Sequence, residues 1–247
     1  MKRYKHTIQI VAIILLFTST LWAQPTGNEI LDRIDENMSA ETRYVKSKMI
    51  IHGPRSSRTV ESESWGQGES SFTEYLAPAR ENGTKMLKLE DKLWIFSPST
   101  DRTIQISGHM LRQSVMGSDL SYEDMMDDRK LSDVYDAGVV GEETIGEADC
   151  WIVEMQATEE DVAYQMRKLW VDKNRYIPLK EELYAKSGKL LKKTELTNIQ
   201  QHGSRWYPGK MTFKDMLKKG VGTEFIIDEI RFDVPIPEYI LSKAALR

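Results

Sequence analysis

Residue types that perform chemistry are few in this sequence and lie far apart. Outside the N-terminal stretch the histidines are His52, His109 and His202. None of them belongs to a spaced metal-binding motif such as H-E-x-x-H. Isolated histidines are usually solvated or act as hydrogen-bonding caps. The sequence therefore predicts neither a metal site nor a cofactor.

The chain has one cysteine, Cys150, which precedes Trp151 at the start of an expected strand. Such a cysteine is typical of a small buried hydrophobic residue rather than a nucleophile. The motifs G-x-S-x-G, G-x-x-x-x-G-K-[ST] and G-x-G-x-x-G are absent from the sequence. We therefore expect a protein that is not an enzyme.

The densest group of acidic residues comprises Asp119, Glu123, Asp124, Asp127 and Asp128. A calcium loop would need a tighter order of ligands around a central glycine, which this group lacks. Acidic residues are favoured in the first turn of a helix, and Ser121 followed by Asp124 resembles a capping pattern. We expect the group to be a helix start with a solvated face.

Apolar residues at helical spacing fill the same region. They are Met110, Leu111, Val115, Met116, Leu120, Met125 and Met126. Such a stripe is most often ordinary core, but methionine also suits adaptable apolar binding surfaces. The composition leaves two interpretations open: a lid over a cavity, or plain core.

The elements around this region are almost all strands. The capping-box pair Thr26 and Glu29 begins an N-terminal helix with an apolar face. Alternating runs separated by turn residues then predict about eleven strands without βαβ alternation, so the sheet should be antiparallel and strongly curved. The runs cover residues 44–52, 59–66, 71–76, 84–89, 93–97, 139–145, 150–156, 164–171, 179–186, 190–199, 210–217 and 223–232, with a further strand after residue 101. Turns are expected at residues 187–188, 207–209 and 219–220. The tail, residues 235–247, is expected to form a short closing helix.

Residues 1–23 are typical of a secretory signal peptide, because Lys2, Arg3 and Lys5 precede an uncharged run that ends in Ala23. The alternative is an uncleaved membrane anchor. No cysteine follows the run, so no acyl anchor of the chain's own is expected. Cleavage removes three of the 34 basic residues and leaves 31 against 38 acidic ones, which disfavours nucleic acid and anionic membrane surfaces as main partners. Residues 24–247 are then expected to form a single domain.

Two segments carry a resemblance to a known family. Residues 91–98, Asp-Lys-Leu-Trp-Ile-Phe-Ser-Pro, resemble the D-G-K-x-L-W-x-Y-x-P strand of the LolA-type periplasmic lipoprotein carriers, without its glycine. Residues 112–124 are similar to the Met-Gly-Ser-Asp-Phe-Ser-Tyr-Glu-Asp segment of a LolA-like branch of outer-membrane lipoprotein-sorting proteins. The close match covers residues 76–128, and the rest agrees in the order of strands and helices.

The resemblance implies an incomplete antiparallel β-barrel whose apolar cavity takes the acyl chain of a lipoprotein or another lipid. We define the lid segment as residues 107–128 and expect residues 107–119 to be a mobile helix. The expected lid side chains are Met110, Leu111, Val115, Met116 and Leu120. The expected cavity side chains are Phe72, Leu87, Trp94 and Phe96. Arg80 and Arg112 are expected to be polar latches for the lid.

The function that follows is a periplasmic carrier that delivers acyl chains toward the outer membrane. An inner-membrane transporter would be the donor and an outer-membrane protein the acceptor. Two alternatives stay open: a regulatory binding protein of the MucB/RseB type, and an accessory subunit that hands lipids to a membrane exporter. The separate C-terminal domain of the MucB/RseB-type sensors has no counterpart in this sequence.

Overall fold

The structure is a computed structural model that describes residues 24–53 and 55–247. The predicted signal peptide, residues 1–23, lies outside the described residues. Among the residues described, no helix has both the length and the apolar character needed to span a lipid bilayer.

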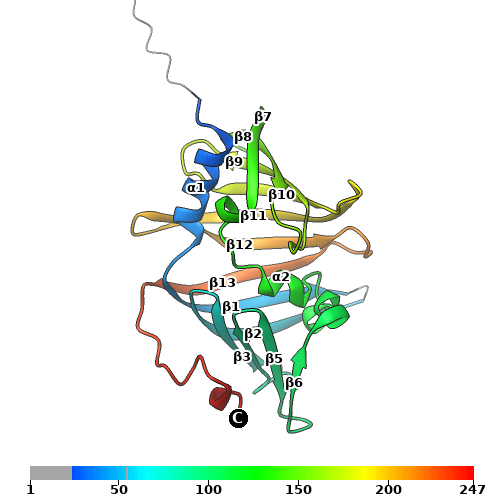
Figure 1. The fold of residues 1–247 in the computed structure, drawn as a ribbon. Helices are drawn as coiled ribbons and strands as arrows, with labels where there is room; N and C mark the ends of the chain where they lie inside the picture. Colours follow the sequence, from blue (N-terminus) through cyan, green and yellow to red (C-terminus); the bar gives the residue numbers. More distant parts are fainter. Residues whose placement is uncertain (1–23, 54) are drawn as a thin grey trace, which may run out of the picture.

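One antiparallel sheet of 13 strands dominates the chain (Figure 1). Its order is β6-β5-β4-β3-β2-β1-β13-β12-β11-β10-β9-β8-β7, so β1 pairs with β13 in the middle and the edges β6 and β7 do not meet. The strands are β1 (Thr42–His52), β2 (Ser57–Gln67), β3 (Ser70–Ala77), β4 (Lys85–Leu89), β5 (Lys92–Ser97), β6 (Arg102–Ile106), β7 (Tyr135–Ile145), β8 (Ala148–Ala157), β9 (Met166–Asp172), β10 (Pro178–Tyr184), β11 (Leu190–His202), β12 (Arg205–Asp215) and β13 (Thr223–Phe232). The predicted fold class, a curved incomplete barrel of mainly antiparallel strands, is confirmed.

Helices are few and short. They are α1 (Gly27–Met38), η1 (Gly108–Arg112), η2 (Val115–Gly117), α2 (Tyr122–Met126), α3 (Leu131–Val134) and η3 (Lys243–Leu246). The predicted capping box is present in α1, where the Glu29 backbone N–H donates to the Thr26 hydroxyl at 3.2 Å and the Thr26 N–H donates to the Glu29 carboxylate at 2.7 Å. The expected closing helix of the tail is the single short turn η3.

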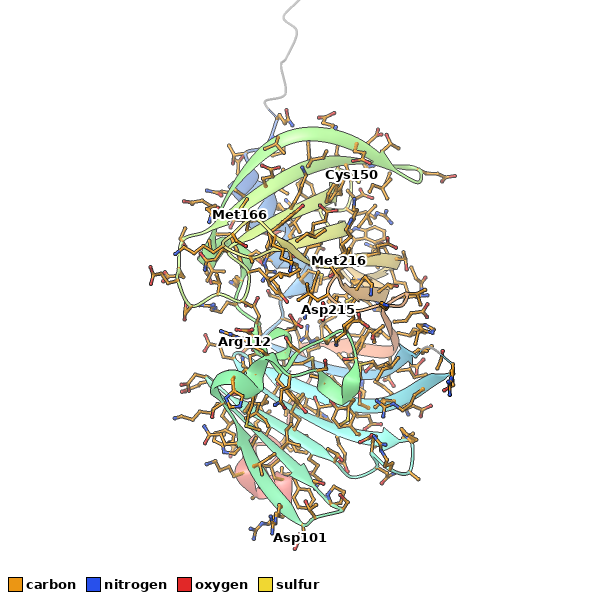
Figure 2. All side chains as sticks on the ribbon, turned by 90° about the vertical axis from the view of Figure 1, so that its right-hand side faces the viewer. Asp101, Arg112, Cys150, Met166, Asp215 and Met216 are labelled. Carbon is orange, nitrogen blue, oxygen red and sulfur yellow. The ribbon has the colours of Figure 1, made fainter. Side chains whose placement is uncertain are left out.

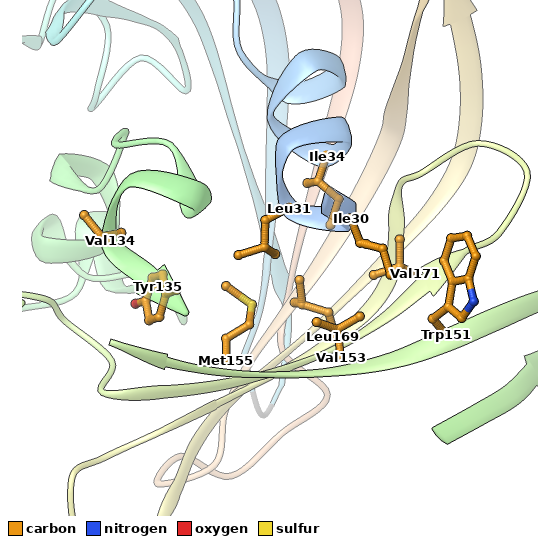
Figure 3. Packing of buried hydrophobic residues seen from close by; sticks show 10 residues of the cluster. All are labelled: Ile30, Leu31, Ile34, Val134, Tyr135, Trp151, Val153, Met155, Leu169 and Val171. Atoms are coloured by element: carbon orange, nitrogen blue, oxygen red, sulfur yellow. The ribbon is translucent and has the colours of Figure 1, made fainter. Parts of the chain in front are cut away.

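Helix α1 covers one end of the sheet. Its fully buried side chains Ile30, Leu31 and Ile34 point toward β8 and β9, where they meet Val153 and Leu169 (Figure 3). Burial of a residue of this size contributes about 1.5–3 kcal/mol relative to exposure. These contacts form the largest apolar core of the molecule and hold β7–β9 at a fixed distance from α1.

The predicted total of about eleven strands is too low, because the predicted runs number thirteen and the structure has 13 strands. One predicted turn is wrong. Residues 207–209 are part of β12 rather than a turn, and Pro208 pairs with Ile199 of β11. Asn198 is left out of the pairing and has φ of +52°, and a Cβ on Gly209 would lie 2.5 Å from the Asn198 side chain. The register does not shift at this point, and residues 205–209 of β12 have no partner in β13, so Pro208 lies in an edge portion of the strand, where proline is tolerated.

Candidate functional site

The lid segment connects the two edges of the sheet, since β6 precedes it and β7 follows it after α3. It therefore crosses one face of the sheet from edge to edge (Figure 1). The expected single helix over residues 107–119 is wrong: two 3-10 turns, η1 and η2, stand in its place. Met116 and Gly117 have φ of +52° and +72°, values that break a helix. The segment then folds back, with the Val115 N–H donating to Leu120 O at 2.9 Å.

Apolar side chains of the lid segment pack on the sheet in two groups. Met110 and Leu111 contact the group of Met86, Leu93 and Ile106 on β4, β5 and β6, together with Met125 and Met126. Met116 and Leu120 contact the group of Met49, Val60 and Tyr75 on β1, β2 and β3. Val115 is 2 % exposed. The lid's own side chains thus cover the apolar strip of this face, which we call the inner face.

The four expected cavity residues lie on the opposite face. Phe72, Leu87 and Trp94 form a buried cluster with Leu246, and Phe96 packs against it. The lid segment is not part of this cluster, so the expectation that the lid closes over these residues is wrong. Alternation correctly placed Trp94 and Phe96 on one side of β5, but that side is covered by the C-terminal tail, residues 235–247, through Ile240 and Leu241.

Acidic residues hold the lid segment on the inner face. Asp124 forms an ion pair with Lys192 of β11 and accepts a hydrogen bond of 2.6 Å from the Tyr164 hydroxyl. Each side chain of the Asp124–Lys192 pair is 11 % exposed. Burial raises the pKa of Asp124, but the Lys192 charge and the hydrogen bonds outweigh it, so the pKa is lowered. Asp124 is therefore ionised and bound to the sheet at neutral pH.

A second set of ion pairs follows directly in the chain. Asp127 pairs with Arg167 of β9, which also donates to Glu181 of β10 at 3.3 Å. Burial raises the pKa of Glu181 in spite of the Arg167 charge. Asp128 pairs with Lys88 of β4, whose side chain is only 4 % exposed. The lid is thereby bound to strands from both halves of the sheet.

Asp119 provides a third attachment. Its carboxylate accepts from the Thr223 hydroxyl at 2.8 Å and from the Asp215 N–H at 2.9 Å. The Asp119 N–H donates to the same Thr223 hydroxyl at 3.0 Å. The prediction of a solvated acidic face is therefore wrong for Asp119, Asp124 and Asp127. We call these three residues and Asp128 the acidic latch.

Neither predicted arginine latch contacts the lid. Arg80 is 79 % exposed in its side chain and pairs with Glu81 at 3.0 Å, and Arg112 is exposed on the lid itself. Two other arginines reach the lid segment: Arg167 through Asp127, and Arg58 of β2, which donates to Met116 O and lies 3.4 Å from Glu81. Arg80 therefore acts on the lid at most through the shared partner Glu81.

A cavity of about 330 Å³ opens at the edge of the lid segment. Its lining combines Leu111 and Met126 of the lid with Lys88, Asp128 and Asp161. A second cavity of about 450 Å³ lies at the end of α1, between Asn37, Arg175, Arg205 and Trp206. Charged and polar side chains line most of both cavities; the first adjoins the lid segment through Leu111 and Met126, whereas the second is far from the lid in sequence.

Groups suited to catalysis are scattered. Cys150 is fully buried, and burial, with the Asp172 charge, raises its pKa to about 11. The residues that the structure describes contain no group of three or more His, Cys, Asp or Glu side chains placed to hold a metal ion. The described site consists of the apolar strip on the inner face, the lid segment that packs on it, and the acidic latch that binds the lid segment to the sheet.

Comparisons with known proteins agree with this geometry. A family model described as "-like: Uncharacterized protein" matches residues 67–247. No curated protein matches the chain. Among solved structures, the chain is similar to an outer membrane lipoprotein-sorting protein domain from Vibrio parahaemolyticus, with 24 % identity, a TM-score of 0.76 and coverage of 89 % of this chain and 97 % of that one.

Two further structures are equally similar. A DUF1329 family protein from Desulfovibrio piger has 25 % identity and a TM-score of 0.79, with 90 % of this chain and 98 % of that chain covered. A LolA superfamily protein from Nitrosomonas europaea has 24 % identity and a TM-score of 0.75, with 90 % and 100 % covered. The likeness in fold therefore extends over nearly the whole of the described chain.

Proposed function

We propose that this chain, which belongs to the family whose model matches residues 67–247 and has a LolA-like fold, carries acyl chains on its inner face and delivers them toward the outer membrane. The cargo is the acyl group of a lipoprotein, or another lipid with a chain of similar length. The protein acts in the periplasm after removal of residues 1–23. An inner-membrane transporter loads it and an outer-membrane acceptor unloads it.

The observation that carries this proposal is the fit between the lid and the apolar strip beneath it. Met110 and Leu111 pack on Met86, Leu93 and Ile106 without a polar contact among these five side chains. The side chains of methionine and leucine make the same kind of apolar contact as a hydrocarbon chain. An acyl chain that replaces them on the strip therefore meets a surface that is already shaped for aliphatic groups.

The lid also explains how a carrier can release its cargo. Burying a 16-carbon chain contributes about 12 kcal/mol at about 0.8 kcal/mol per CH₂, an affinity that would make release too slow. If the chain must displace lid side chains from the same strip, the lid gives up its own apolar packing there, which offsets most of this gain. The net affinity is then set by the lid, and the acidic latch adjusts it.

Noncatalytic transfer is consistent with the rest of the site. The similar structures from Vibrio parahaemolyticus and Nitrosomonas europaea are described as a sorting domain and a LolA superfamily protein. Cys150 is fully buried, and the Tyr164 hydroxyl donates to Asp124. Binding and release of an apolar chain need only the strip and its cover.

The test is a competition between lid and ligand. Replacing Met110, Leu111 and Met116 with alanine should tighten binding of an acyl probe, measured by displacement of a fluorescent fatty acid. A similar loss of volume in the α1 core, with Ile30, Leu31 and Ile34 replaced by alanine, is the matched control. That control should lower the melting temperature without tightening binding. A lid variant that binds more weakly and melts at a much lower temperature would show that these side chains are ordinary core.

A covalent pin gives the opposite perturbation. The Thr223 hydroxyl lies 2.8 Å from the Asp119 carboxylate and 3.0 Å from the Asp119 N–H, so Asp119→Cys with Thr223→Cys brings two thiols within reach of a disulfide. The oxidised double variant should lose acyl binding, and reduction should restore it. Equal binding in both redox states would contradict the proposal that the lid must move.

A further inference from the structure

The loop between β12 and β13 exposes apolar side chains in an unusual concentration. In residues 216–222, Met216, Leu217 and Val221 are 41 %, 64 % and 73 % exposed. Figure 2 shows Met216 next to Asp215, where β12 ends. Three of the seven large hydrophobic residues that are exposed in the described chain therefore project from this one loop.

The loop holds these side chains outward by a defined backbone conformation. The Met216 N–H donates to Leu191 O at 2.8 Å, and the Leu217 N–H donates to the Asp215 carboxylate at 2.9 Å. Gly222 has φ of +105°, and a Cβ there would clash with Phe213 O. Gly222 is required for this turn, and the two hydrogen bonds fix where the turn starts. The Leu217 side chain is therefore exposed in the folded conformation of the loop.

Basic residues surround the apolar tip. Lys218 and Lys219 lie within the loop, Lys214 precedes it, and residues 216–222 contain no acidic residue. Gly220 lies against the β1–β2 turn, where a Cβ would be 3.9 Å from His52 O, and that turn adds the exposed Arg55. Asp215 and Asp119 pair with Lys218 at 3.8 Å and with Lys214 at 4.0 Å and also accept backbone N–H groups, so Lys219 and Arg55 carry the remaining positive charge of the patch. The patch is therefore cationic in a chain whose net charge is −4.

We infer that residues 216–222 dock the protein on an anionic lipid surface. Aliphatic side chains that enter the headgroup region, flanked by lysines that pair with lipid phosphates, are the chemistry of peripheral membrane attachment. A protein partner would more commonly offer aromatic anchors a pocket, and this loop exposes no aromatic residue or cavity. The charge of the patch identifies phosphate-bearing lipid as its complement.

The same loop is bound to the lid, which connects docking to the lid's position. The Lys218 ammonium donates to the Ser114 hydroxyl at 2.6 Å and to Ser118 O at 2.5 Å. On a lipid surface, phosphate oxygens compete for this ammonium group, and residues 114–118 lose an attachment. This second step rests on the proposed function, whereas docking itself does not.

Vesicle sedimentation tests the docking step. Wild-type protein should bind vesicles of phosphatidylcholine with 30 % phosphatidylglycerol, and Leu217→Ser with Val221→Ser should lower the partition coefficient at least about tenfold. Lys219→Gln should lower it about fivefold, and raised salt should release the wild-type protein. Val140→Ser is the matched control, because Val140 is 53 % exposed on the edge strand β7. It should bind like the wild type.

A thiol probe tests the release step. In a Val115→Cys variant the new side chain replaces one that is 2 % exposed, so a maleimide should react slowly in solution. Anionic vesicles should accelerate the reaction at least tenfold, and the acceleration should disappear when the Leu217 and Val221 substitutions are added. The parent protein, in which Cys150 is fully buried, gives the background rate.

The outcomes separate the two steps. Equal vesicle binding by the wild type and the Leu217/Val221 double variant, or no salt-sensitive binding at all, would overturn lipid docking and leave a protein as the loop's partner. Docking without faster labelling of the Val115→Cys variant would overturn the coupling to the lid. Acyl binding measured without vesicles is independent of both, so failure of the carrier proposal would be recognised separately.

Discussion

Neutralising Asp124 should open the lid without unfolding the sheet. Asp124 and Lys192 are each 11 % exposed, so an Asp124→Asn substitution leaves the Lys192 ammonium nearly buried and without its ion-pair partner. Loss of one partner of a buried pair costs about 3–5 kcal/mol. The asparagine keeps one of the two oxygens, so it can retain the bond from the Tyr164 hydroxyl to Oδ1 or the bond from the Ser121 N–H to Oδ2, which measure 2.6 Å each, but not both. We therefore take about 3 kcal/mol as the expected loss for the closed lid.

This loss should appear mainly in ligand binding. If an acyl chain binds only when the lid has left the strip, destabilising the closed state by about 3 kcal/mol raises the apparent affinity by up to roughly 100-fold. If the lid instead unfolds together with the sheet, the same free energy lowers the melting temperature by about 6–12 °C. Titration of a fluorescent acyl probe and calorimetry on the same sample distinguish the two results.

Removing both charges provides the control. Asp124→Asn combined with Lys192→Met leaves no unpaired charge, so the double variant should return to within about 1 kcal/mol of the wild type. Asp133→Asn changes an exposed carboxylate just beyond the lid segment and should have no effect. The role proposed for the Asp124–Lys192 pair would be refuted if the changes in acyl affinity caused by Asp124→Asn alone and Lys192→Met alone simply add in the double variant. It would also be refuted if the Asp124→Asn variant binds the acyl probe with wild-type affinity.

Three further results are expected. Because the lowered pKa of Asp124 keeps the Lys192 pair intact above the ordinary carboxyl value of 3.8, affinity for an uncharged acyl ester should be constant from pH 8 to pH 5 and should rise only below about pH 4; an earlier rise would place the controlling group elsewhere. Leu246→Ala should lower stability by about 3 kcal/mol in urea unfolding and shift Trp94 emission, since Leu246 packs on Trp94, but it should leave acyl affinity unchanged because both lie on the face opposite the lid. Cys150, with its pKa raised to about 11, should react with iodoacetamide at pH 8 more than about 100-fold more slowly than a free thiol, unless the fold opens.

Local patterns were sufficient to predict most elements of the fold. Alternation and turn residues identified the strands, and the Thr26 and Glu29 pair marked the start of α1. Alternation also placed Trp94 and Phe96 together, but it could not tell which side of β5 faces the lid. Both sides of that strand carry apolar residues, since Leu93 and Ile95 alternate with them, and both sides are covered. Only the path of the C-terminal tail decides the question.

The acidic latch was missed for a related reason. Within the sequence, Asp124 and Asp127 stand in a helix start where acidic residues are common, and nothing nearby marks them as partners of buried cations. Their partners, Lys192 and Arg167, are 68 and 40 residues further along the chain. A lysine at a buried alternation position of a strand is the one local signal that the sequence offers, and Lys88 and Lys192 each occupy such a position.

The pairing of β1 with β13 determines when the sheet can be completed. Strands β2–β6 and β8–β12 each form from neighbours in the sequence, whereas β1 pairs with a strand that lies about 180 residues later and that also closes on β12. Until that strand arrives, the two meanders are joined only by the lid segment and by the connection through α1. The inner face then lacks strand β13 between β1 and β12, and a chain in this state exposes Met49 and Phe213. The protein is thus most vulnerable to aggregation during the last step of its own folding, when a single ten-residue strand unites the two halves.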